Sequence, residues 1–249
     1  MNNIFLFDID GTLSINGIIP TSAKEIIKTI RKKGDLVLLA TGRCFAQLDS
    51  ILSLIEVDGA IMNNGGYIAV KNETIYKNPI DKKAIKRLMD MGYHVAILNE
   101  YHYARIEDHK IFKEFADYFN IDQARLLPSE VFDEDCYSLG VYTYYPDNLD
   151  KSLFPELDFV KVAPLGFDVI CHNVSKGAAV KVIKEKYPSA RIIAFGDNYN
   201  DIEMLLAADI SISMPSAPKE VKDISNYVTK SPLEDGISYA IKEYLKYED

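Results

Sequence analysis

The sequence predicts an α/β fold in which a doubly wound, mostly parallel sheet is interrupted by an inserted α+β module. Continuous apolar runs bounded by polar residues occur at residues 4–7 and 36–40, as expected for strands buried on both faces. The same strand and helix pattern returns near the C-terminus, after a tyrosine-rich middle stretch of different character. Two distant parts of the chain are therefore expected to share one sheet.

The N-terminal part begins with a β-α-β unit. Ala23, Ile26, Ile27 and Ile30 recur at helical spacing between the first two strands, and Gly34 is well placed to end that helix. The elements expected next are a helix around residues 45–55, a strand at 60–62, a break at 63–66, and a hairpin of strands 67–70 and 74–76 with its turn at 71–73.

The middle and C-terminal parts differ in pattern. Amphipathic helices are expected near residues 82–91 and 109–119, with antiparallel strands within 137–145. The α/β pattern then gives a helix at 175–187, a strand at 192–195, a helix at 201–208, a strand at 210–212 and a closing helix at 233–247. We therefore predict a sheet domain formed by residues 1–80 and 169–249, with the inserted module at 81–168.

Composition limits the partners. The 249 residues include 28 Lys and Arg against 37 Asp and Glu, and the formal charge of −9 disfavours nucleic acid and anionic lipid. The three cysteines have wide, irregular spacing that suits neither a disulfide framework nor a zinc site. No apolar run approaches the ~18 residues needed to cross a membrane, and Asp8 interrupts any signal-peptide core. We expect a cytoplasmic protein without a membrane or nucleic-acid partner.

The first apolar strand ends in two carboxylates, Asp8 and Asp10, followed by Gly-Thr. A carboxylate at the end of a buried strand is unfavourable unless a cation or hydrogen-bond donors meet it. Other segments carry polar groups near strand ends or helix starts: Thr41 in A-T-G-R, Lys176 in S-K-G, and Asp197 and Asp201 in G-D-N-Y-N-D. Because the carboxyl ends of parallel strands meet at one crevice, we expect these side chains to come together.

The charges of this set indicate a metal site. Four carboxylates and one lysine remain negative, so an anionic substrate needs an added cation. Oxygen donors suit Mg²⁺, whereas no histidine or cysteine cluster favours zinc. Mg²⁺, a lysine, a small hydroxyl residue and a strand-end carboxylate together point to phosphoryl transfer through an aspartyl-phosphate.

The four segments, in this order, resemble the motifs of the haloacid-dehalogenase superfamily of aspartate-nucleophile phosphatases, and are most similar to its Cof-type sugar-phosphatase branch. The resemblance implies that Asp8 attacks phosphorus and that Asp10 acts as acid and base. Phosphoryl-binding residues would be Thr41, Gly42 and Lys176, whereas Asn200 would either bind phosphate or cap a helix. The implied Mg²⁺ ligands are Asp8, the carbonyl of Asp10, and Asp197, with Asp201 supporting the metal or its waters.

The resemblance also implies that residues 81–168 form a cap that chooses a small phosphorylated metabolite, such as a sugar phosphate or a phosphorylated cofactor. Asn64, Gly65, Gly66 and Asn173 are expected to border the substrate space, although a backbone turn alone would explain the two glycines. The sequence carries no signal for the oligomeric state.

Two other functions share this residue set. A phosphomutase or phosphotransferase would return the phosphoryl group to a sugar hydroxyl instead of water. A receiver-like signalling domain would use Asp, Thr and Lys as a phosphorylation switch. The candidate general acid Asp10 and the inserted module favour turnover, so hydrolysis of phosphate monoesters is the function we expect.

Overall fold

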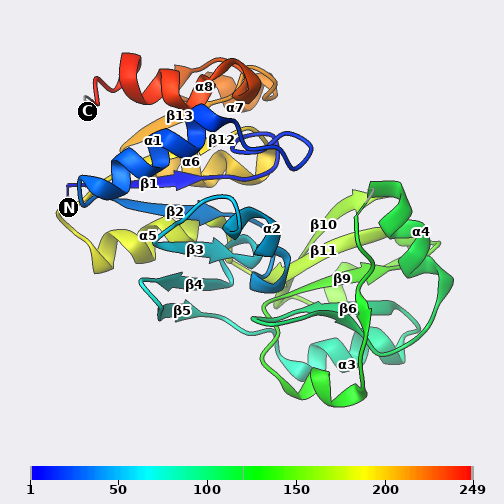
Figure 1. Ribbon diagram of the computed structural model, residues 1–249. Coiled ribbons are helices and arrows are strands. Elements are labelled where there is room, and N and C mark those ends of the chain that lie inside the picture. The colour runs from blue at the N-terminus through cyan, green and yellow to red at the C-terminus, as the bar shows by residue number, and fades with distance from the viewer. Residues whose placement is uncertain (1, 120, 248–249) are drawn as a thin grey trace. The chain divides into compact units, whose positions relative to one another are not determined.

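The computed structural model describes residues 2–119 and 121–247 (Figure 1). The chain divides into two compact units. The sheet unit contains Met1–Gly42, Leu48–Tyr76 and Ser175–Asp249, and the inserted unit contains Arg43–Gln47 and Lys77–Val174. Arg43–Gln47 thus groups with the inserted unit although it lies within residues 1–80, and the sequence-based domain bounds stay a proposal.

An eight-stranded sheet forms the centre of the sheet unit, in the order β14-β13-β12-β1-β2-β3-β4-β5. Strands β14 to β3 pair in parallel, and β4 pairs antiparallel with β3, so the predicted mostly parallel sheet is confirmed. Its strands are β1 (Asn3–Phe7), β2 (Leu36–Ala40), β3 (Gly59–Met62), β4 (Tyr67–Val70), β5 (Glu73–Lys77), β12 (Arg191–Gly196), β13 (Ile210–Ser213) and β14 (Tyr227–Val228).

Helices cover this sheet because its strands are apolar on both faces. Ile4 and Leu6 of β1 pack in one cluster with residues of two helices, α5 and α6. Phe5, which points to the other face, meets the ring of Tyr247 edge-on at 5.4 Å. The helices of this unit are α1 (Thr21–Lys32), α2 (Asp49–Leu52), α5 (Lys176–Lys186), α6 (Ile202–Ala207), α7 (Lys219–Asp223) and α8 (Gly236–Tyr239).

The inserted unit has its own six-stranded sheet and core. The strand order is β10-β11-β9-β6-β7-β8. Val95 and Ile97 of β6 pack in the cluster that includes α3, whereas Ala96 packs with α4, so the two helices use opposite faces. The elements are α3 (Lys82–Asp90), β6 (His94–Leu98), β7 (Tyr103–Arg105), α4 (Lys110–Phe119), β8 (Arg125–Leu126), β9 (Ser138–Tyr142), β10 (Leu157–Ala163) and β11 (Gly166–Cys171).

Three elements are shorter than the sequence predicts. The helix expected at 45–55 is a 3-10 turn (Phe45–Gln47) followed by α2, because the Gln47 N–H donates to the Cys44 carbonyl three residues back, as in a 3-10 turn. The closing helix is divided at Asp235, whose φ of 61° is left-handed. The strand within 137–145 ends at Tyr142, because Thr143 Oγ1 accepts from Tyr145 N–H in a turn.

Candidate active site

The candidate active site lies at the carboxyl ends of β1 and β12, at the centre of the sheet. Phe7 is in register with Phe195, and the Asp8 N–H donates to the Phe195 carbonyl at 3.0 Å. The chain continues into Gly196 and Asp197 directly beside it. The parallel register therefore brings residues nearly 190 positions apart to one edge, as the sequence predicts.

Lys176 is the central cation of this site. Its side chain is 0% exposed, and Nζ donates to Asp8 Oδ1 at 2.6 Å and to Asp201 Oδ1 at 2.7 Å. Burial alone would lower the pKa of Lys176, but Asp8 and Asp201 outweigh it and raise this pKa, so the ammonium keeps its proton. A buried charge of this kind is tolerable only where an opposite charge meets it.

The carboxylate of Asp201 is fully engaged within the protein. Its Oδ1 accepts from Lys176, and its Oδ2 accepts from the backbone N–H groups of Asp197 and Asn198, each at 3.0 Å. These bonds hold the turn that leads from β12 into α6. Asp201 therefore acts on the site by fixing Lys176 and the loop that carries Asp197.

Asp197 is held by the loop after β1. Thr12 Oγ1 donates to Asp197 Oδ1 at 2.8 Å, and Gly11 has a φ of +93°. A Cβ at position 11 would overlap the Asp197 carboxylate, so only glycine permits this approach. Burial raises the pKa of the Asp197 carboxyl, an effect that Thr12 opposes. The sequence analysis gave Thr12 no role, although it lies in the motif that contains Asp8 and Asp10. A small hydroxyl residue in that motif was the sequence feature that could have indicated a hydrogen bond to the site.

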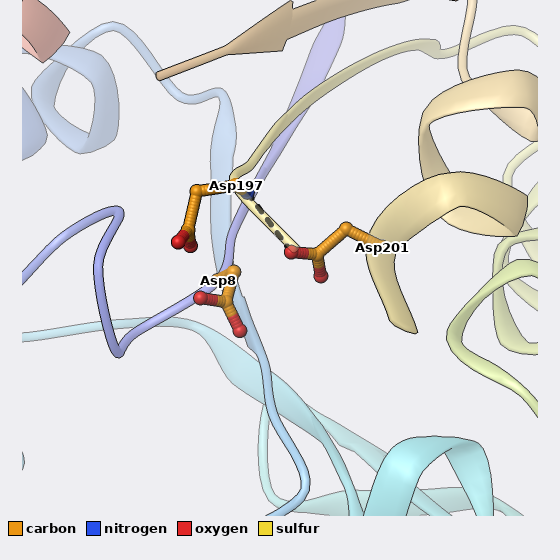
Figure 2. Close-up of side chains that lie close together, drawn as sticks. All are labelled: Asp8, Asp197 and Asp201. Atoms are coloured by element: carbon orange, nitrogen blue, oxygen red, sulfur yellow. Dashed lines mark hydrogen bonds between the residues drawn. The ribbon is translucent and has the colours of Figure 1, made fainter. Parts of the chain in front are cut away.

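Carboxylate oxygens of Asp8, Asp197 and Asp201 lie within 4.8 Å of one another (Figure 2). The side chain of Asp197 points toward that of Asp8, whereas Asp201 meets the Asp197 backbone (Figure 2). Burial raises the pKa of Asp8, an effect that Lys176 opposes and that the neighbouring carboxylates of Asp201 and Asp197 reinforce. The excess negative charge and the hard oxygen donors fit a divalent cation held by Asp8 and Asp197.

Asp10 and Thr41 lie on the loops next to this group. Asp10 is exposed and lies two residues beyond Asp8. Its backbone forms an isolated parallel β-bridge with that of Ser14. Thr41 is buried directly after β2, the neighbour of β1 in the sheet. Its backbone N–H donates to the Ile61 carbonyl at 2.9 Å, which continues the ladder between β2 and β3.

Three further predicted residues come together in the sheet unit. Asn200 Nδ2 donates to Asn64 Oδ1 at 3.4 Å, and a Cβ at Gly42 would lie 3.1 Å from Asn64 Nδ2. Gly66 is buried and its N–H donates to the Asn63 carbonyl at 3.1 Å, while Gly65 lies against the carbonyl of Ser175. The predicted turn at Gly65 and Gly66 is therefore real, and it contacts the start of α5.

Asn173 differs from these residues. It belongs to the inserted unit, is exposed, and has a φ of 65° in the turn after β11. Its expected place beside the substrate remains a prediction.

No helix within residues 2–119 and 121–247 has the length and apolar character to span a membrane.

Similar proteins were found by sequence and by structure. The sequence model of the haloacid dehalogenase-like hydrolases matches residues 5–241. The chain is 31% identical over 250 residues to the putative phosphatase YkrA of Bacillus subtilis (strain 168), with 97% of each protein covered. It is 24% identical over 267 residues to the 5-amino-6-(5-phospho-D-ribitylamino)uracil phosphatase YitU of the same strain, again with 97% of each covered.

Two solved structures share the fold over almost their whole length. A hypothetical protein from Geobacillus kaustophilus HTA426 superposes with a TM-score of 0.90 at 25% identity, covering 98% of this chain and 99% of that one. The HAD subclass IIB sugar phosphatase BT4131 gives a TM-score of 0.77 at 28% identity, with the same coverage.

Proposed function

Because the chain belongs to the haloacid dehalogenase-like hydrolase family and is a phosphatase of that family, we propose that it hydrolyses small phosphate monoesters through an aspartyl-phosphate on Asp8. The observation that carries this proposal is the buried Lys176, which binds Asp8 and Asp201 beside Asp197. Lys176 Nζ donates to Oδ1 of Asp8, which supports Oδ2 as the nucleophile.

The chemistry divides between two carboxylates. An oxygen of Asp8 forms a bond to phosphorus while the bond from phosphorus to the ester oxygen breaks, and Asp10 gives its proton to the departing alcohol. Asp10 then takes a proton from water as that water attacks phosphorus, releasing inorganic phosphate and regenerating Asp8. The exposure of Asp10 supports this role, because its carboxyl must exchange protons with a leaving group and with water.

Phosphoryl oxygens would be held by Lys176, Thr41, Gly42 and Asn200, with the Asn64 amide supporting Asn200. Asp8, the Asp10 carbonyl and Asp197 would hold Mg²⁺, and Asp201 would support that group by fixing the loop of Asp197. Bound Mg²⁺ supplies positive charge for the transferred phosphoryl oxygens. Phosphatases of this family generally use a divalent metal ion, and the clustered carboxylates are the feature of this chain that supports Mg²⁺.

The substrate we propose is a small phosphorylated metabolite, such as a sugar phosphate or a phosphorylated cofactor. Two similar proteins carry such names, a sugar phosphatase and a phosphatase of 5-amino-6-(5-phospho-D-ribitylamino)uracil. The acidic surface of this chain supports a small ligand held by local contacts in place of a polyanion such as nucleic acid.

The test is hydrolysis of p-nitrophenyl phosphate and of a panel of phosphorylated sugars and cofactors in Mg²⁺. Asp8→Asn should lower kcat by at least about 10³-fold, because an amide cannot form the phosphoenzyme. Asp90→Asn changes an exposed carboxylate of α3 and should keep wild-type kcat. Undiminished turnover in Asp8→Asn would contradict the nucleophile, and an isomerised phosphosugar in place of free phosphate would favour a phosphotransferase.

A further inference from the structure

Lys176 is the first residue of α5, so the position of its ammonium depends on where that helix begins. We propose that Glu203, an exposed residue of α6, is a positioning residue that acts through Ser175. Its hydrogen bond to Ser175 fixes the start of α5 against α6, so that the Lys176 ammonium bridges Asp8 and Asp201. The kinetic part of this inference rests on the proposed role of Asp8 as nucleophile.

Ser175 has two hydrogen bonds. Its Oγ accepts from the Ala178 N–H at 3.0 Å, which caps α5, and its hydroxyl donates to Glu203 Oε2. A hydroxyl has one donor and two acceptor positions, so both bonds form together. The bond to Glu203 is charge-assisted and therefore stronger than a neutral one. A single side chain thus ties the cap of α5 to the first turn of α6.

Close backbone contacts hold Ser175 and its neighbour from two sides. A Cβ at Gly177 would lie 2.5 Å from Glu203 Cβ, so α5 and α6 approach to glycine distance there. A Cβ at Gly65 would overlap the Ser175 carbonyl, and Gly65 has a φ of +108°. Asn64 before it is also left-handed, with a φ of 52°. Backbone of this kind persists only where the surrounding structure imposes it.

Two parallel links therefore join α5 to the chain around the start of α6. The inner link is the Lys176–Asp201 ion pair, at 2.7 Å and fully buried. The outer link is the Ser175–Glu203 hydrogen bond. Ser175 directly precedes Lys176, and Glu203 follows Asp201 by two residues. Without the outer link, the Ser175 side chain no longer fixes the start of α5, and the ammonium of Lys176 must hold Asp201 while it also reaches Asp8 at 2.6 Å.

A simpler role for Glu203 makes a different prediction. An acidic residue in the first turn of a helix stabilises that helix through its dipole. If this were its only role, its removal would lower the free energy of unfolding and leave kcat unchanged. A positioning role predicts instead that kcat falls, because a shift of about 1 Å in a group that aligns the nucleophile can cost about 10²-fold in rate.

The experiment uses the full-length protein and four variants with p-nitrophenyl phosphate in Mg²⁺. Glu203→Ala should lower kcat about tenfold with KM changed less than about twofold, because alignment matters most in the transition state. Glu203→Gln keeps an acceptor for Ser175 and should recover kcat to within about threefold of wild type. Ser175→Thr keeps the hydroxyl and should do the same. Glu185→Ala removes another exposed glutamate, on α5, and is the matched control.

Wild-type kcat in Glu203→Ala, or equal impairment of Glu203→Gln and Glu203→Ala, would overturn the proposal. A crystal structure of Glu203→Ala gives a readout without activity. There the distance from Lys176 Nζ to Asp8 Oδ1 should exceed its 2.6 Å by about 0.5 Å or more. If the wild-type protein hydrolyses none of the esters, the proposed function fails, and this distance still decides the inference: an unchanged Lys176 rejects it.

Discussion

At the scale of single residues, the carboxylates around Lys176 differ in how far the protein satisfies them. Asp201 accepts from Lys176 and from two backbone N–H groups, whereas Asp8 accepts from Lys176 through its Oδ1. Burial raises the pKa of Asp8, and Asp201 adds to this rise, although Lys176 opposes both. This arrangement supports the proposed binding of a cation and a substrate, at some cost to the stability of the metal-free protein.

This imbalance predicts that Asp8→Asn stabilises the metal-free protein. A folded-state pKa above the unfolded value means that stability is fully present below the unfolded pKa, near 3.8, and falls as pH rises through the folded pKa. In EDTA, the variant should gain about 1 kcal/mol in unfolding free energy at pH 8, and less at pH 5, by urea denaturation. Asp90→Asn should gain nothing, and an equal loss of stability in Asp8→Asn at both pH values would refute the argument.

At this scale the sequence predicted that Asp8, Lys176, Asp197 and Asp201 lie close together, and the structure brings these four residues together. It did not predict which oxygens remain open for a cation. That depends on hydrogen bonds from Thr12 and from the loop backbone, which form only after the chain has folded. Glu203 had no motif at all, because its contact with Ser175 requires the close packing of α5 on α6.

At the scale of elements, the start of β1 is held by a carboxylate in the turn between α1 and β2. Asp35 accepts from the Asn2 N–H at 2.7 Å, from the Asn3 N–H at 3.0 Å and from Asn3 Nδ2 at 2.7 Å. The Tyr247 hydroxyl donates to it at 3.0 Å from the C-terminal segment. Burial opposes ionisation of Asp35, but these bonds outweigh it and hold its pKa below the usual value.

Asp35→Asn should therefore lower the free energy of unfolding by about 2 kcal/mol at pH 7. Because the folded pKa is depressed, this stability is present above the unfolded pKa and is lost as pH falls through the folded pKa. The difference between wild type and variant should shrink as the solution becomes more acidic, as measured by urea denaturation from pH 7 to pH 3. Tyr247→Phe removes one bond and should cost less. A difference independent of pH would show that charge is not involved.

In the sheet unit, periodicity predicted most strands and the longer helices because their apolar faces are buried throughout, whereas in the inserted unit it predicted strands only within 137–145. It failed where one residue interrupts the pattern locally. The Gln47 N–H donates to the Cys44 carbonyl in a 3-10 turn, and the left-handed Asp235 divides the C-terminal helix. Such events depend on single dihedral angles and side-chain contacts, which a hydrophobic pattern does not record.

At the scale of the whole molecule, the two units are built differently from the chain. The inserted unit is nearly continuous, from Lys77 to Val174, and has its own apolar clusters. In the sheet unit, β1 lies between β2 and β12, so its central strand pairs with segments on both sides of the insertion. The sheet unit can therefore complete its sheet only after the inserted residues have been synthesised.

This difference predicts how fragments behave. A fragment of residues 77–174 should fold alone and unfold cooperatively on heating, because its core is local to it. A fragment of residues 1–76 should not, because it lacks β12 and α5, which cover β1. Circular dichroism during thermal unfolding, with the full chain as reference, measures both. Cooperative unfolding of 1–76, or a disordered 77–174, would contradict this division.

The sequence by itself determined the fold class, the polar residues at the strand ends and the family to which the chain belongs. These features follow from local rules, because apolar periodicity and the order of motifs can be read from the sequence without knowing which residues are in contact. The tertiary structure alone decided that Asp201 is satisfied by Lys176 and the loop backbone, and that Glu203 reaches Ser175 beside that lysine. Those contacts join segments that only the parallel sheet and the packing of α5 on α6 bring within hydrogen-bond distance.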